Sequence, residues 1–80
     1  MPDVQLRLLA SGILYRACLR AMAAAHAPSP EEKMALHARV EEAAWALPEG
    51  ALRELEERDV DDGPPDTQMW RELVQRLVKP

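Results

Sequence analysis

The sequence contains no phenylalanine, a single cysteine and only three glycines. A lone cysteine, Cys18, excludes an internal disulfide and a zinc site built from several thiolates, and a reducing compartment is its natural setting. β-Branched residues other than scattered valines are also scarce, whereas alanine and leucine are abundant. Because alanine and leucine favour helices over strands, this composition predicts an all-α protein.

Charge is unevenly distributed along the 80 residues, whose net charge is −4. Residues 1–40 carry five basic and three acidic side chains, whereas residues 41–80 carry five basic and eleven acidic ones. The acidic second half argues against nucleic-acid binding, and the mildly basic first half suits an acidic partner. We expect no transmembrane segment, because arginines interrupt the longest apolar run.

The first predicted helix runs from about Asp3 to Ala25. Its apolar residues fill two arcs: Val4, Leu8, Leu14, Tyr15, Cys18, Leu19 and Met22 on one, and Leu6, Leu9, Ala10, Ile13, Ala17 and Ala21 on the other. Only Gln5, Arg16 and Arg20 form a polar strip. A helix that is apolar nearly all round is either central in a core or covered by a partner. Since 80 residues cannot easily surround it, the pattern predicts an obligate partner.

Prolines divide the rest of the chain. Ser29 is placed as an N-cap, with Glu32 positioned to complete a capping box, for a second helix that reaches about Leu47. Pro48 predicts a break or kink before a short helix over residues 49–58. The chain 1–80 is therefore expected to form a single domain, an all-α three-helix bundle whose middle helix is broken or kinked at Pro48.

The last helix is expected to follow the loop at residues 58–66, RDVDDGPPD, with Asp66 or Thr67 as its cap. It reaches about Val78, and its apolar side chains share one face: Met69, Trp70, Leu73, Val74, Leu77 and Val78. Glu72 and Arg76 have the spacing of an ion pair on the opposite face.

No combination of side chains predicts catalysis. His26 lies at a helix end, where capping or exposure is its expected role, and His37 with Glu41 supplies two metal ligands without a third. Acidic residues of the second half lack the spacing of a calcium loop and predict a solvated face: Glu54, Glu56, Glu57, Asp59, Asp61 and Asp62. Trp45 and Trp70 are expected as core or interface anchors. We therefore expect a non-enzymatic interaction protein without a metal site or a cofactor of its own.

Residues 14–20, LYRACLR, contain a Leu-Tyr-Arg triplet followed by a Leu-Arg pair. This seven-residue segment, early in the first helix of a short helical chain, resembles the signature of the LYR-motif family of small mitochondrial proteins. The acidic, proline-containing loop at 58–66 resembles the family's passage from second to third helix. The chain departs from the family in its acidic net charge and in lacking a Phe-Arg pair late in the second helix, a position for which Leu55 and Trp45 are the candidates.

The resemblance implies a partner, mitochondrial acyl carrier protein, whose 4'-phosphopantetheine arm carries a fatty acyl chain that inserts between the helices. It implies that acyl carrier protein is bound by Leu14, Tyr15, Arg16, Leu19 and Arg20. It also implies that the acyl chain is lined by Ala17, Cys18, Ala21, Met22, Val40, Leu73 and Leu77. The two arginines suit the carboxylates of an acidic carrier and the phosphate of its arm.

The same resemblance implies an accessory subunit or assembly factor in the mitochondrial matrix or on the matrix side of the inner membrane. Respiratory complex I is the first choice of host; another respiratory complex, the iron–sulfur cysteine desulfurase and the mitochondrial ribosome are the others. A stable subunit is favoured over a soluble factor, because so much apolar surface needs permanent cover. The alternative is a small bacterial self-associating helical module with an accidental triplet, paired through Trp70, Leu73 and Leu77 of its last helix.

Overall fold

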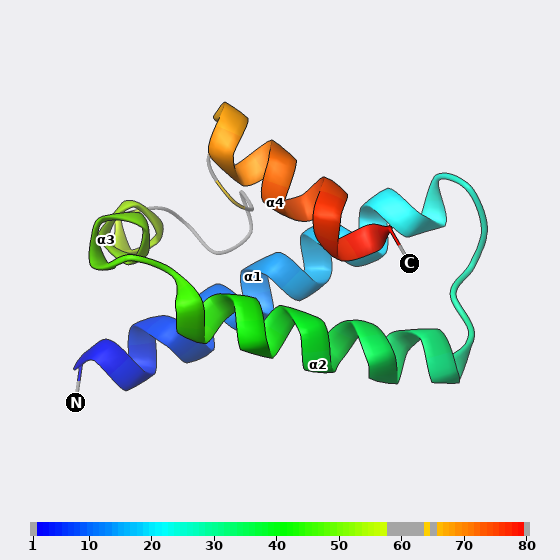
Figure 1. Ribbon diagram of the computed structural model, residues 1–80, viewed down its shortest axis with the longest axis horizontal. Coiled ribbons are helices and arrows are strands. Elements are labelled where there is room, and N and C mark those ends of the chain that lie inside the picture. Colours follow the sequence, from blue (N-terminus) through cyan, green and yellow to red (C-terminus); the bar gives the residue numbers. More distant parts are fainter. Residues whose placement is uncertain (1, 58–63, 65, 80) are drawn as a thin grey trace.

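The computed structural model describes residues 2–57, 64 and 66–79, which form four helices and no strand (Figure 1). The helices are α1 (Pro2–Ala23), α2 (Pro30–Ala46), α3 (Glu49–Glu56) and α4 (Gln68–Val78). The predicted all-α class is therefore confirmed for this part of the chain. Three of the helices end slightly earlier than expected, α1 and α3 by two residues and α2 by one. Most of the expected loop, together with Asp59, Asp61 and Asp62, lies outside the described residues.

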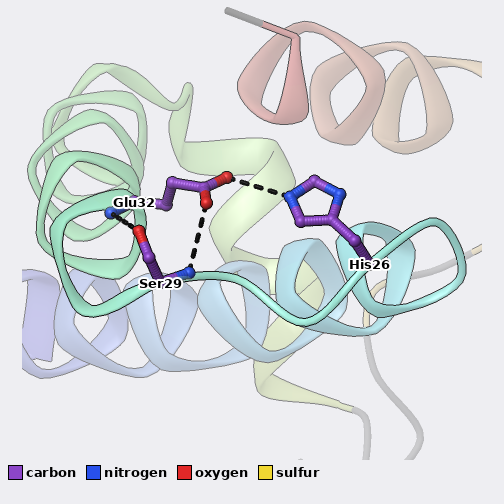
Figure 2. A network of polar contacts seen from close by, with 3 residues as sticks. All are labelled: His26, Ser29 and Glu32. Atoms are coloured by element: carbon purple, nitrogen blue, oxygen red, sulfur yellow. Dashed lines mark hydrogen bonds and ion pairs between the residues drawn. The ribbon is translucent and has the colours of Figure 1, made fainter.

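The turn between α1 and α2 is held by a polar network of three side chains (Figure 2). The Ser29 hydroxyl accepts a hydrogen bond from the Glu32 backbone N–H, and the Ser29 N–H donates to Glu32 Oε1, both at 3.2 Å. The predicted capping box is thus confirmed. Glu32 Oε2 lies 3.1 Å from His26 Nε2, so the histidine after α1 contacts the first turn of α2. One carboxylate therefore joins the end of one helix to the start of the next.

Protonation of Glu32 is expected to open this network. Hydrogen bonding by His26, and then by the Ser29 backbone, holds the pKa of the Glu32 carboxyl below its ordinary value of 4.5. A lowered pKa in the folded state means that the stabilisation is fully present above pH 4.5 and is lost as pH falls through the lowered pKa. A ¹³C NMR titration of the Glu32 carboxyl should give a midpoint below 4.5.

Two histidine variants show whether His26 itself lowers the Glu32 titration midpoint. His26→Ala should move the Glu32 midpoint upward, because it removes the strongest of the hydrogen bonds that favour the carboxylate. His37→Ala, at the chain's other histidine, should leave it unchanged. A midpoint at or above 4.5 in the native protein, or one that both variants move equally, would contradict the network.

The first helix is the central element of the fold. It packs against α2, α3 and α4, and α2 also contacts α4. Figure 1 shows α2 returning along α1 in the opposite direction, with α4 lying beside both. Buried apolar side chains from all four helices form one core: Ala10, Ile13, Leu14, Cys18, Leu36, Val40, Ala44, Leu47, Ala51, Leu52, Leu55, Trp70, Leu73 and Leu77. Burial of these side chains is the main stabilising term.

The helical conformation is fully interrupted at Pro48. Leu47 and Pro48 both have extended backbones, with ψ values of 140° and 153°. This geometry follows from the proline, which lacks an N–H donor and disfavours the helical conformation of the residue before it. Beyond the break α3 turns away from α2 and is seen almost end-on in Figure 1. The two segments are consequently separate helices.

The last helix places its predicted apolar face inward. Trp70, Leu73 and Leu77 are buried, and the Trp70 Nε1–H donates a hydrogen bond to Glu54 Oε2 at 3.2 Å. Thr67 occupies the N-cap position, although its side chain makes no capping hydrogen bond. The outer face differs from expectation, because Glu72 accepts a hydrogen bond from Gln68 Nε2 at 2.9 Å and forms no ion pair with Arg76 among the described residues.

Candidate docking surface on the first helix

The segment LYRACLR lies in the middle of α1 and divides between its two faces. Leu14 and Cys18 are fully buried on the inner face. Tyr15 is half-buried at the boundary between α1 and α2, where its ring forms a T-shaped contact with the His37 ring at a centroid distance of 5.5 Å. The first residue of the triplet therefore belongs to the core, and the second attaches α1 to α2.

The two arginines of the segment lie on the outer face. Arg16 and Arg20 are both exposed and one helical turn apart. Arg16 Nε makes a long hydrogen bond of 3.4 Å to the Gly12 carbonyl of its own helix. Among the residues that the structure describes, no carboxylate lies within ion-pair distance of either guanidinium. Both charges are therefore available to an anionic partner.

Apolar side chains lie next to these arginines. At 100° per residue, Leu8, Gly12 and Leu19 lie on the same side of α1 as Arg16. Leu8 is 56% exposed and Leu19 is half-buried. We call Leu8, Gly12, Arg16, Leu19 and Arg20 the α1 docking surface. It pairs positive charge with apolar area, a combination that suits a protein partner.

Gly12 belongs to the α1 docking surface but lies outside the LYRACLR motif, so it was not among the expected docking residues. A Cβ atom added there would meet no atom within 4 Å, so the helix backbone is open to solvent at this point. Glycine inside a helix costs roughly 0.5–1 kcal/mol relative to alanine, so helix stability does not account for it. The signal available in the sequence was a glycine within an otherwise helical pattern. Its effect is a notch in the α1 docking surface, where a partner can approach the backbone closely.

Some of the residues expected to line an acyl chain are packed in the core. Cys18 and Val40 are fully buried in the core, whereas Ala17 is half-buried outside it. Burial raises the pKa of the Cys18 thiol to about 11, against the opposing effect of the nearby Arg39 charge. The thiol is consequently neutral and unreactive near neutral pH, which agrees with its interpretation as a small core residue.

The other four expected lining residues fall into two separate hollows. Ala21 and Met22 line a hollow of about 360 Å³ between the end of α1, the start of α2 and Val78 of α4. Leu73 and Leu77 line a groove of about 450 Å³ between α2 and α4. The structure therefore brings these residues together in pairs and not around one tunnel.

Two arginines outside the motif hold the helices together. Arg7 Nη1 donates hydrogen bonds to the Ala44, Trp45 and Leu47 carbonyls at 3.1, 2.8 and 3.1 Å. Its guanidinium also lies 5.8 Å from the centroid of the Trp45 ring. Arg7 thereby binds carbonyl groups at the C-terminus of α2, where the Ala44 carbonyl also accepts a hydrogen bond from the Leu47 N–H at 3.4 Å.

Arg39 has the same role for α4. Its Nε and Nη2 donate to the Leu77 carbonyl at 3.2 and 3.0 Å. The contacts of Arg7 and Arg39 span 37 to 40 residues of sequence. No local pattern in the sequence indicates pairings at that separation, which is why neither role was predicted.

The other polar candidates form no site. His37 Nδ1 lies 3.9 Å from Glu41 Oε2 on the exposed surface of α2. Within the described residues no group of three or more histidine, cysteine, aspartate or glutamate side chains is placed to hold a metal ion. Of the two tryptophans expected as core or interface anchors, Trp70 lies in the core. Trp45 is 45% exposed and lies beneath the Arg7 guanidinium.

Comparison with known proteins identifies no relative, so the functional interpretation is based on the geometry of the structure. No family model, curated protein or solved structure matches the chain. None of the described helices is long and apolar enough to cross a membrane.

Proposed function

We propose that this chain is a non-catalytic adaptor of the LYR-motif type, which docks acylated mitochondrial acyl carrier protein through the α1 docking surface. The observation that carries the proposal is the pair Arg16 and Arg20, exposed one turn apart and without a carboxylate partner among the described residues. They lie on the outer face of a helix whose inner face is core. This division matches what a docking helix requires, because one face stabilises the fold while the other meets the partner.

The charges favour an acidic partner. Guanidinium groups bind carboxylates and phosphates through paired hydrogen bonds, and acyl carrier proteins offer both, on their surface and on the phosphopantetheine arm. Exposed charges of this kind contribute mainly to the association rate and to orientation, and their effect weakens with salt. The exposed Leu8 and the half-buried Leu19 add apolar contact.

The hollow at the end of α1 is the natural entry for an acyl chain. It is lined by Ala21 and Met22, which follow Arg20 directly in the sequence. Each CH₂ group buried there contributes about 0.8 kcal/mol. The core residues Cys18 and Val40 would line the chain only if it reached further between the helices.

The proposal extends to the three-helix architecture of the family and to a mitochondrial location. α2 and α3 correspond to one middle element broken at Pro48, which gives the three-helix arrangement of the family. The protein acts in the mitochondrial matrix or on the matrix side of the inner membrane, as an accessory subunit or assembly factor, with respiratory complex I as the first choice of host. Met34, Trp45 and Met69 are exposed away from the motif and are suited to host contacts.

Charge reversal tests the docking surface. Arg16→Glu combined with Arg20→Glu should weaken the affinity for acyl carrier protein by at least about a hundredfold, or roughly 2.7 kcal/mol, because attraction becomes repulsion at two positions. Co-purification should then be lost. Isothermal titration calorimetry with the purified carrier measures the change, and circular dichroism should show unchanged helicity.

A matched control separates docking from net charge. Arg53→Glu combined with Arg71→Glu changes the charge by the same amount at exposed positions on α3 and α4, and should leave binding within a few-fold of the native protein. If Arg16→Glu/Arg20→Glu retains native affinity, or if the control loses as much, the assignment of α1 as the docking surface is wrong.

The alternative, a self-associating bacterial module, lacks a supporting observation at its expected surface. Trp70, Leu73 and Leu77 are 1%, 9% and 7% exposed, because the core of the same chain already covers them. Pairing of two copies through that face would require α4 to leave its own domain.

A further inference from the structure

One side of the α1/α2 pair is not covered by the rest of the fold. α4 lies against the side of α2 that bears Arg39, which is hydrogen-bonded to the Leu77 carbonyl. The Tyr15–His37 contact is on a different side, and the His37 side chain is 60% exposed. Among the described residues, the exposed large apolar side chains other than Met69 all belong to these two helices: Val4, Leu8, Met34 and Trp45. The pair therefore presents an open face with apolar area.

This open face consists of one row of side chains from each helix. On α1 it is the α1 docking surface, because Leu19 lies one turn beyond Tyr15 on the same side of the helix. On α2, Met34 and Glu41 lie three residues before and four residues after His37. We call the α1 docking surface and the α2 row together the outer face, in which the α2 row is made of exposed residues only: Glu31, Met34, Ala38, Glu41 and Trp45.

The two rows of the outer face have opposite charge. The α1 docking surface holds two arginines and no acidic side chain, whereas the α2 row holds Glu31 and Glu41. Among the residues that the structure describes, Glu31 has no ion-pair partner and Glu41 has only a contact of 3.9 Å with His37. Lys33 lies four residues before His37, on the α1 side of the row. A face that is basic along one helix and acidic along the other, with apolar side chains in both, is complementary to a second copy of itself.

Contacts between α1 and α2 fix which residues lie at the same height along the pair. The two helices run in opposite directions (Figure 1). Tyr15 is level with His37, and Arg7 is level with Trp45, whose carbonyl accepts a hydrogen bond from it at 2.8 Å. Each step toward the C-terminus of α1 therefore corresponds to one step toward the N-terminus of α2.

At these heights, charged and apolar residues of one row match those of the other. Leu8 lies one residue from the level of Trp45, and Arg20 lies one residue from the level of Glu31. A two-fold axis that runs between the helices and parallel to them exchanges α1 with α2 and leaves every height unchanged. Residues at one height within a single copy therefore meet face to face between two copies.

We infer that the outer face binds a second copy of this chain in a two-fold symmetric pair, with α1 of each copy on α2 of the other. Arg20 then meets the second copy's Glu31, and Arg16 lies midway in height between that residue and the second copy's Glu41. Leu8 packs on the second copy's Trp45. Both rows are covered in this arrangement, and each ion pair and apolar contact occurs twice.

The size of the outer face indicates a weak pair. α2 has 17 residues and is therefore about 25 Å long, and two packed helices are about 20 Å wide, which gives roughly 500 Å² per copy. Standard stable interfaces bury about 800 Å² per partner. The pair is therefore expected to form at concentrations on the order of hundreds of micromolar and to dissociate at micromolar concentrations.

This pairing goes beyond the proposed docking of acyl carrier protein and does not require it. Because Arg16 and Arg20 belong to both contacts, a docked carrier excludes the second copy and leaves the α2 row free. The face is also different from the buried face of α4 that contains Trp70.

Charge exchange tests the pairing with the full chain alone. Arg16→Glu/Arg20→Glu makes both rows acidic and Glu31→Arg/Glu41→Arg makes both rows basic, so each variant should be monomeric at concentrations where the native chain pairs. An equimolar mixture of the two variants should pair again, because every basic row then faces an acidic one. Sedimentation velocity over a concentration series measures the pairing, native mass spectrometry identifies the mixed pair, and circular dichroism checks the helicity of each variant.

A control with the same change in net charge is Glu56→Arg/Glu57→Arg, at exposed positions at the end of α3. It should pair with itself as the native chain does and should not restore pairing of Arg16→Glu/Arg20→Glu, because only one of the two edges matches in that mixed pair. Leu8→Ala should weaken native pairing about tenfold, since its contact occurs twice.

Three results would overturn the inference: a native chain that stays monomeric throughout the concentration series, a mixture of the two charge variants that does not pair, or pairing that Leu8→Ala leaves unchanged. No acyl carrier protein is present in these experiments, so their failure is distinct from failure of the proposed function.

Discussion

Replacing Leu14 with alanine should lower the free energy of unfolding by about 2–5 kcal/mol. Leu14 is fully buried among the other core residues of α1 and its neighbours, so truncation removes apolar contacts and leaves a cavity. A domain of this length has a net stability of roughly 4–12 kcal/mol, so the change is a large fraction of the total. Urea denaturation followed by circular dichroism measures it.

Leu8→Ala is the matched control on the same helix. Leu8 is 56% exposed, so its truncation should change stability by less than about 0.5 kcal/mol. Comparable losses in the two variants would show that Leu14 does not lie in the core. The comparison also separates the parts of the LYR triplet, because Leu14→Ala is expected to act on folding, whereas substitution of Arg16 is expected to act on docking.

The second large effect is expected at Arg7. Arg7→Met keeps the apolar stem but removes the hydrogen bonds to the Ala44, Trp45 and Leu47 carbonyls at the end of α2. It should destabilise the protein by about 1.5–3 kcal/mol, the usual range for a hydrogen bond to a charged group. Arg7→Lys should recover only part of this loss, since an ammonium group presents a different donor geometry.

Arg16→Met provides the comparison for Arg7. Arg16 is exposed on the same helix and contacts only a carbonyl of its own helix, so the substitution should change stability by less than about 0.5 kcal/mol. Thermal unfolding of the four proteins, native included, gives the ranking. An Arg7→Met variant as stable as Arg16→Met would show that the contacts between α1 and the end of α2 do not support the fold.

Local rules predicted the helices of this protein well. Pro48 ends α2 for reasons of backbone geometry, and the capping box of Ser29 and Glu32 depends on residues only three apart. The inner face of α4 followed from a regular 3.6-residue pattern. In each case the physical cause lies within a few residues of its effect.

The orientation of α1 was not predictable from its sequence. The helix is apolar on nearly every side, so periodicity did not indicate which arc is buried. The structure buries Ala10 and Ile13 from one predicted arc together with Leu14 and Cys18 from the other, and leaves Leu8 exposed. Packing against three other helices decides this, and packing depends on residues far apart in the chain.

The candidate site was predicted in part. Arg16 and Arg20 lie on the exposed strip that the sequence indicated, together with Gln5. Apart from Ala17, the expected acyl-chain residues are distributed among the core and two hollows, because the break at Pro48 and the placement of α4 decide which side chains meet. Helical spacing does not contain that information.

Native mass spectrometry of the chain co-expressed with mitochondrial acyl carrier protein tests the central proposal most directly. We predict a one-to-one complex in which the carrier has the additional mass of acyl-phosphopantetheine, and we predict that Arg16→Glu/Arg20→Glu dissociates it. A chain that appears alone or as a homo-oligomer, with the carrier free in the same sample, would contradict the proposed function.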